Sequence, residues 1–271
     1  MSGQAQRLID LNNQIRKQLL SVGNNIITFS SGKGGTGKTF ISMNLAFSLA
    51  AKKKVLLIDL DLNLGNSHLL LNFAPVKTIG HFLSQRELFR NIITKYDNNL
   101  HFIFGDSGTE YERIDFESLY TRINEISIEY DLVLIDLGAG VNKNVLTTIA
   151  YAGTNCIITT PETTAVMDAY VLIKLLLKNC YSGKNLVVVN KCLDKESGTT
   201  AFNNLNTAAS HFLKKDLLLL GTIPLDIEAA RSVQEQYILS VRQINSSAKF
   251  AISDIVNKIL DINHLANISQ S

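Results

Sequence analysis

The sequence contains no tryptophan, three cysteines and three prolines among its 271 residues. The cysteines, Cys156, Cys180 and Cys192, form no CxxC pair, so neither a disulfide framework nor a cysteine-based zinc site is expected. Such sparse cysteine fits a reducing compartment. The low proline content and the 16 glycines also exclude long Pro-rich linkers and fibrous repeats.

Charge of a single sign and long apolar runs are missing too. The 26 Lys and Arg residues nearly cancel the 24 Asp and Glu residues, and the net charge of +2 excludes an acidic disordered chain and a strongly basic nucleic-acid coat. No stretch reaches the about 18 consecutive apolar residues of a membrane-spanning helix. The first residues are polar where a secretory signal is apolar. We therefore expect a cytoplasmic protein, at most peripheral at the inner face of the cell membrane.

The chain does contain a repeated alternation of short apolar runs with helical patterns. Runs rich in Val, Ile and Leu begin at Asn25, Lys54, Leu100, Asp131, Asn155, Asn185 and Leu217. Helical patterns occupy residues 39–51, 116–128, 144–151, 163–177 and 201–212. Apolar strands separated by helices indicate right-handed crossovers. The sequence therefore predicts an α/β fold whose mostly parallel central sheet has helices on both faces.

Two amphipathic segments flank this alternation, so we divide the chain into a helix at 1–22, a domain at 23–240 and a helical segment at 241–271. In the first segment, apolar residues from Leu8 to Leu19 recur at helical spacing. The last segment places these apolar side chains largely on one helix face: Phe250, Ile252, Ile255, Val256, Ile259 and Ile262. Either helix can simply cover the sheet.

A phosphate-binding loop follows the first apolar run. After Ser30 the chain continues as SGKGGTGKT, which satisfies the G-x-x-x-x-G-K-[ST] pattern between a strand and a helix. Glycines let backbone N–H groups converge on phosphate oxygens, and the helix that follows adds the positive end of its dipole. We expect Lys38 to reach the β- and γ-phosphates and the Thr39 hydroxyl to ligate Mg²⁺. The expected nucleotide-binding residues of the loop are Gly32, Lys33, Gly34, Gly35, Thr36, Gly37, Lys38, Thr39 and Phe40.

Carboxylates follow two other apolar runs. Asp59 and Asp61 end the run that begins at Lys54, and Asp136 ends the run that begins at Asp131. The carboxyl ends of parallel strands face the ligand crevice of an open α/β sheet. Asp136 is thus placed to hold the water shell of Mg²⁺, beside a mobile glycine turn. We expect Asp59 to be structural or to support the residues that contact the ligand, and Asp61 could serve as the cap of the next helix.

Lys33 adds a second cation inside the phosphate loop, where an ordinary loop does not require one. With Lys33 the loop fits K-G-G-x-G-K-[ST], and the chain resembles the MinD and ParA type of deviant Walker A ATPases, which are P-loop NTPases of the SIMIBI class. This resemblance implies an ATP-dependent homodimer in which Lys33 of one subunit reaches the phosphates bound by the other. The alternative is a lysine solvated at the edge of the loop.

The same resemblance implies roles near the γ-phosphate. It implies that Asp61 positions the attacking water and contacts the Mg²⁺ shell, and that residues 63–66 form the first switch loop. The catalytic residues are then Lys33, Lys38 and Asp61. The metal site is then formed by Thr39, Asp61 and Asp136, and ATP and Mg²⁺ are the expected ligands.

Adenine is favoured over guanine because the guanine-specific N-K-x-D pattern fails. Asn190 and Lys191 are present, but Leu193 occupies the position of the required aspartate. A D-x-x-G switch beginning at Asp136 fails likewise, because it meets Ala139. The resemblance places the base against Asn190, Lys191, Pro224 and Leu225. On general grounds Asn190 could instead form a turn.

Within this family, several stretches are similar to the FlhG group of flagellar-number regulators, also called FleN or YlxH. They are Gly138 in LIDLGAG, residues 159–174 and residues 221–236. The similarity implies an ATP-hydrolysing switch that regulates flagellar number, placement and biosynthesis. It also implies an FlhF-type GTPase or another flagellar component as partner. Residues 3–9 keep the Gln, Ala and Leu of the FlhF-activating motif but lack both of its charged ends, so a plain surface helix is the alternative.

Other members of the family remain alternatives. One is a ParA or Soj type segregation ATPase that binds DNA nonspecifically, and another is a MinD-type regulator of the division site. The net charge of +2 and the lack of a conspicuous Lys/Arg cluster after Gly183 make nucleic acid an unlikely partner. A carboxy-terminal helix tethers some family members to membrane. Here Asp254 and Asp261 offset Lys249 and Lys258, which favours packing over a membrane surface.

Overall fold

The computed structural model describes residues 25–62, 65, 67–106, 115–179, 181 and 183–268. The helix predicted at 1–22, with its motif at 3–9, lies outside these residues, as does most of the loop predicted at 63–66.

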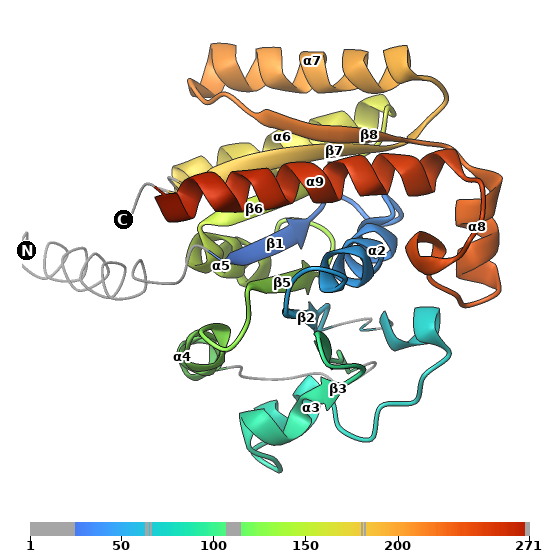
Figure 1. Ribbon diagram of the computed structural model, residues 1–271. Coiled ribbons are helices and arrows are strands. Elements are labelled where there is room, and N and C mark those ends of the chain that lie inside the picture. The colour runs from blue at the N-terminus through green and yellow to red at the C-terminus, as the bar shows by residue number, and fades with distance from the viewer. Residues whose placement is uncertain are drawn as a thin grey trace, which may run out of the picture.

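The sheet has eight strands in the order β3-β4-β2-β5-β1-β6-β7-β8 (Figure 1). The strands are β1 (Ile26–Ser30), β2 (Val55–Leu60), β3 (Thr94–Lys95), β4 (Leu100–Ile103), β5 (Leu132–Leu137), β6 (Thr154–Thr159), β7 (Lys184–Cys192) and β8 (Leu218–Pro224). All neighbours pair in parallel except β3 with β4. The predicted α/β fold with a mostly parallel sheet is therefore confirmed, and the short antiparallel edge strand β3 is an addition to it.

Helices cover both faces of the sheet (Figure 1). The α-helices are α2 (Lys38–Ala50), α3 (Ile79–Leu83), α4 (Phe116–Ser127), α5 (Lys143–Ala152), α6 (Thr163–Lys178), α7 (Lys195–Leu213), α8 (Ile227–Gln234) and α9 (Ser247–Ile268). Three 3₁₀ turns complete the described part: η1 (Ser67–Leu71), η2 (Phe89–Ile92) and η3 (Leu239–Val241). Side chains of α2 and α9 form one apolar core with alternate strand residues, and those of α4, α5, α6 and α7 form the other. This alternation is why the strands read as unbroken apolar runs.

Helix α7 begins six residues before the predicted start at 201, at Lys195. The Asp194 carboxylate accepts a hydrogen bond from the backbone N–H of Ser197 at 2.7 Å, and the Ser197 side chain completes a capping box. The prediction missed this start because it followed apolar spacing and overlooked the cap.

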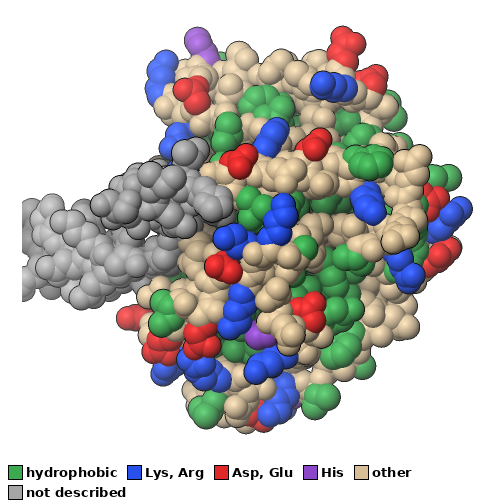
Figure 2. Space-filling model, in the orientation of Figure 1, with side chains coloured by type: hydrophobic (Ala, Val, Ile, Leu, Met, Phe, Trp, Pro, Cys, Tyr) green, Lys and Arg blue, Asp and Glu red, His purple; other side chains and the backbone are tan. Residues whose placement is uncertain are grey.

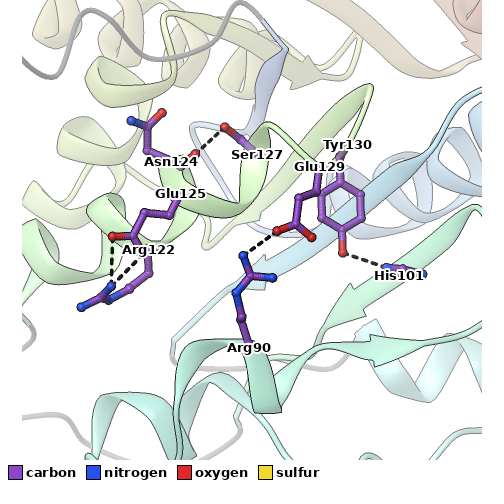
Figure 3. A network of polar contacts seen from close by, with 8 residues as sticks. All are labelled: Arg90, His101, Arg122, Asn124, Glu125, Ser127, Glu129 and Tyr130. Carbon is purple, nitrogen blue, oxygen red and sulfur yellow. Dashed lines mark hydrogen bonds and ion pairs between the residues drawn. The ribbon is translucent and has the colours of Figure 1, made fainter.

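Polar contacts join η2 and β4 to the residues that follow α4 (Figure 3). Arg90 in η2 donates to the Glu129 carboxylate at 2.5 Å, and the Tyr130 hydroxyl meets Nδ1 of His101 in β4 at 2.7 Å. His101 is buried, and burial together with the charge of Lys54 lowers its pKa. The neutral ring suits a position inside this network.

Helix α9 packs on the same core as the rest of the domain. Ala248, Ile252, Ile255, Val256 and Ile259 are buried against α2 and β8. The prediction that Phe250 shares this apolar face is wrong, because its side chain is 59 % exposed. Among the described residues, no helix is both long enough and apolar enough to cross a membrane.

Polar contacts fix both the start and the middle of α9. The Asp226 carboxylate accepts hydrogen bonds from the N–H of Ala248 at 3.0 Å and from the hydroxyl of Ser246 at 2.8 Å. Burial raises the pKa of Asp226, but these and neighbouring hydrogen bonds outweigh it and lower the pKa to about 2. Farther along, Nζ of Lys258 donates to the carbonyl of Leu220 on edge strand β8 at 2.6 Å.

We predict that Ile255→Ala lowers the free energy of unfolding by about 2–5 kcal/mol, because it leaves a cavity in the core between α9 and β8. Urea denaturation followed by circular dichroism measures the change. Phe250→Ala on the same helix is the matched control and should stay within about 0.5 kcal/mol of wild type. Equal effects of the two substitutions would contradict the packing of α9.

Candidate nucleotide-binding site

The phosphate loop lies between β1 and α2, at the carboxyl edge of the sheet. Gly35 and Gly37 have φ angles of 79° and 88°, a region that favours glycine. Gly37 precedes α2 without a side-chain cap, and the first turn of α2 holds no acidic residue. The first N–H groups of α2 and the positive end of its dipole are thus left for an anion.

Two glycines of the loop are required by packing. A Cβ atom on Gly32 would lie 2.3 Å from the backbone carbonyl carbon of Asp168 in α6, and one on Gly37 would lie 2.3 Å from Nδ2 of Asn190. In contrast, a Cβ atom on Gly34 or Gly35 would meet no atom of the described residues within 4 Å. The loop is therefore packed against the domain on one side and open on the other.

Lys38 and Asp136 form a buried ion pair at the centre of the site. Nζ of Lys38 lies 3.0 Å from Oδ1 of Asp136, and the two side chains are 7 % and 1 % exposed. Oδ2 of Asp136 and the hydroxyl of Thr36 are buried and have no hydrogen-bond partner among the described residues. A buried carboxylate oxygen without a partner is rare in proteins, and it fits a site completed by a ligand or its water shell.

These residues fit Mg²⁺ bound together with a nucleotide. In the described part of the chain, no group of three or more His, Cys, Asp or Glu side chains could hold a metal by itself. Mg²⁺ commonly takes one or two protein oxygens and completes its shell with water and phosphate oxygens. Thr39 at the start of α2 and the open oxygen of Asp136 meet that requirement.

Asp59 and Asp136 lie opposite each other in the β2–β5 register. Burial and then the negative charge of Asp136 raise the pKa of Asp59 to about 6, although hydrogen bonds from Ser67 and Asp61 act in the opposite direction. The Asp59 carboxylate accepts the N–H of Asp61 at 3.0 Å and the N–H of Ser67 at 3.2 Å. Asp59 thus holds the backbone of Asp61 and Ser67 within the frame of the site.

Asp61 lies next to the turn that follows β5. A Cβ atom on Gly138 would lie 3.2 Å from Oδ1 of Asp61, so the two segments touch where Gly138 lacks a side chain. The N–H of Gly140 donates to the carbonyl of Ser31 at 2.9 Å, which ties this turn to the start of the phosphate loop. The structure therefore brings Asp61, Asp136 and the loop together.

Lys33 is paired within its own chain. Its Nζ atom lies 2.5 Å from Oε2 of Glu162 and 3.1 Å from the hydroxyl of Thr164, with the Lys33 side chain 33 % exposed. The hydrogen bond and charge of Lys33 lower the pKa of Glu162. Sequence reasoning did not identify Glu162 and Thr164 as site residues. Both residues lie in the stretch 159–174, whose similarity to the FlhG group is the signal for them in the sequence.

Of the four residues predicted to contact adenine, Asn190 and Lys191 lie in β7, Pro224 ends the neighbouring strand β8, and Leu225 directly follows it. Nδ2 of Asn190 donates to the carbonyl of Thr36 at 2.8 Å, and Nζ of Lys191 donates to the carbonyl of Gly35 at 2.8 Å. The N–H of Leu225 donates to the carbonyl of Cys192 at 2.7 Å. Asn190 and Lys191 hold the phosphate loop, while Pro224 and the exposed Leu225 lie beside them. Phe40 packs against the core under α2.

The chain matches a family model and similar proteins over most of its length. The family model described as CobQ/CobB/MinD/ParA nucleotide binding domain covers residues 27–239. The antiactivator FleN of Pseudomonas aeruginosa is 28 % identical over 239 residues, which are 86 % of this chain and 85 % of FleN. The flagellum site-determining protein YlxH of Helicobacter pylori is 30 % identical over 270 residues, 96 % of this chain and 88 % of YlxH.

A solved structure shares the fold. The septum site-determining protein MinD of Pyrococcus horikoshii, complexed with Mg-ADP, superposes with a TM-score of 0.73 at 24 % identity. The match covers 87 % of this chain and 95 % of that protein.

We predict that Gly32→Ala lowers the free energy of unfolding of the nucleotide-free protein by about 1–3 kcal/mol, because its Cβ atom collides with the α6 backbone. Gly34→Ala, which changes the same residue type in the same loop but meets open space, should remain within about 0.5 kcal/mol of wild type. Urea unfolding of both variants measures the difference. A Gly34→Ala protein as unstable as Gly32→Ala would show that the loop is packed on both sides.

Proposed function

Since this chain belongs to the CobQ/CobB/MinD/ParA nucleotide binding family and is an ATPase of the MinD/ParA type, we propose that it is an ATP-dependent dimerising switch that regulates flagellar number or placement. The observation that carries the switch is the buried Lys38–Asp136 pair with its partnerless oxygen, next to Asp61 and under an open phosphate loop. The observation that carries the flagellar role is similarity to FleN and YlxH over most of the chain.

A small number of residues perform the separate steps of ATP binding and hydrolysis. Lys38 and the loop N–H groups bind the phosphates, and Thr39 and Asp136 hold Mg²⁺, which neutralises charge on the phosphate oxygens when bound. Asp61 orients a water molecule for in-line attack on the γ-phosphorus and accepts its proton. Asn190, Lys191, Pro224 and Leu225 receive the adenine base, and the hydrogen bonds of Asn190 and Lys191 to the loop link base and phosphate binding.

Lys33 makes the site depend on a second copy of the chain. Its ammonium is turned toward Glu162 in the single chain and exchanges this exposed partner for phosphate oxygens across the dimer. An exposed ion pair is weak, so the exchange costs little. In the partner's site, Lys33 then stabilises the charge that develops during phosphoryl transfer.

The partner that we propose is a flagellar component, of which an FlhF-type GTPase is one. Residues 3–9 carry that proposal and lie outside the described residues. We also propose that the end of α9 can bind peripherally at the inner surface of the membrane. On the face seen in Figure 2, Lys and Arg side chains are interspersed with Asp and Glu, which supports a protein partner over DNA.

We predict that Asp61→Ala binds ATP but lowers kcat about 100-fold or more, because the attacking water loses its orienting carboxylate. The variant should therefore accumulate as an ATP-bound dimer. Size-exclusion chromatography with light scattering measures the mass of the variant with ADP and with ATP. We expect twice the monomer mass with ATP and the monomer mass with ADP. Asp254→Ala, an exposed aspartate of α9, is the control. Hydrolysis by Asp61→Ala at the wild-type rate would refute the role of Asp61.

We predict that deletion of the gene in its own host changes the number or position of flagella per cell, counted by negative-stain electron microscopy. The wild-type gene, but not the Asp61→Ala gene, should restore the count, because the switch must cycle. Minicells without a flagellar change would instead identify a division-site regulator. ATP-dependent retardation of DNA in a low-salt gel would identify a segregation ATPase.

A further inference from the structure

One buried carboxylate ties both ends of the segment 61–67. Oδ1 of Asp59 accepts the N–H of Asp61, and Oδ2 accepts the N–H of Ser67, where η1 begins. Asp59 is 2 % exposed and Ser67 is also 2 % exposed. Each oxygen of the carboxylate therefore fixes one end of the segment, and the hydrogen bond at the Ser67 end is fully buried.

The backbone around the Asp59 carboxylate is closely packed. A Cβ atom on Gly105 would lie 2.8 Å from Cγ of Asp59, and one on Gly65 would lie 2.7 Å from Cα of Gly105. The backbone of Gly65 thus packs directly against that of Gly105, and Gly105 packs against the carboxylate of Asp59. Only a group of the size of an aspartate, with two acceptor oxygens, satisfies both N–H groups here.

We propose that Asp59 is a positioning residue for ATP hydrolysis, because its two hydrogen bonds hold the segment that carries Asp61 against the turn after β5. The inference rests on the proposed role of Asp61. Asp59 touches neither substrate nor metal in this scheme and acts through the backbone of Asp61. A displacement of about 1 Å at a group that orients a reactant can lower the rate about 100-fold.

The chain offers a matched aspartate for comparison. At the opposite end of the same strand pair, Oδ2 of Asp131 accepts the N–H of Lys54 at 2.7 Å. Asp131 therefore makes a similar aspartate-to-backbone bond at the edge of the sheet remote from the phosphate loop. Its removal costs stability without moving Asp61.

The first test is kinetic. Asp59→Asn keeps one acceptor and turns an NH₂ group toward the other N–H, so kcat should fall about tenfold while the Kd for ADP changes less than about twofold. Gly65→Ala keeps the carboxylate charge but pushes the segment away from Gly105, so it should also lower kcat and not the affinity for ADP. Asp131→Asn should match wild type in both.

The second test does not depend on hydrolysis. Hydrogen exchange of the nucleotide-free protein, followed by mass spectrometry, should accelerate in the peptide 60–71 of Asp59→Asn and remain unchanged in the peptide 31–41. Exchange that rises across the whole chain, or wild-type kcat in Asp59→Asn and Gly65→Ala, would overturn the inference. An equal loss of kcat in Asp131→Asn would also overturn it. A wild-type protein that hydrolyses no ATP would instead refute the proposed function, and the exchange result would still show whether Asp59 holds the segment.

Discussion

The ammonium of Lys38 and the carboxylate of Asp136 lie 3.0 Å apart at positions almost closed to water. Removing two charges from water is costly, and their attraction offsets the cost only when the remaining polar atoms also find partners. Within the described part of the chain one oxygen of Asp136 finds none, and Asp59 adds a second carboxylate directly beside it. The pair is thus incompletely satisfied without a ligand, and anionic phosphates with a divalent cation supply the charges that it lacks.

The parallel sheet makes this concentration of charge possible. Strands β2, β5 and β1 lie side by side in that order and end at the same edge. Asp59 therefore lies opposite Asp136, and the turn after Asp136 reaches Ser31 through the N–H of Gly140, although these residues are far apart in sequence. β7 contributes Asn190 and Lys191 from the other side, which grip the phosphate loop by its carbonyl groups. Packing of Gly32 against α6 completes the frame.

The elements that could be predicted from sequence are those whose signal is local. The phosphate loop, the strand before Asp136 and the alternation of strands and helices each lie within a short window of residues. The pairing of Lys33 with Glu162 and the hold of Asn190 on Thr36 join residues more than a hundred positions apart, so no spacing rule indicates them. The start of α7 had a local signal in Asp194 and Ser197 that apolar spacing hid. Phe250 fits the apolar pattern of α9 yet lies on the outside, because periodicity cannot tell where a stripe ends.

The hydrogen bond from Lys258 to the carbonyl of Leu220 bears on how copies of the molecule can associate. An exposed edge strand is a template onto which a strand of another chain can add, and such addition has no natural end. Lys258 already occupies one of the acceptors on β8, with a charge that an incoming strand would have to displace. Lys258 therefore opposes open-ended growth along this edge, and it leaves the carboxyl edge of the sheet, where the nucleotide site lies, for the dimer contact that we propose.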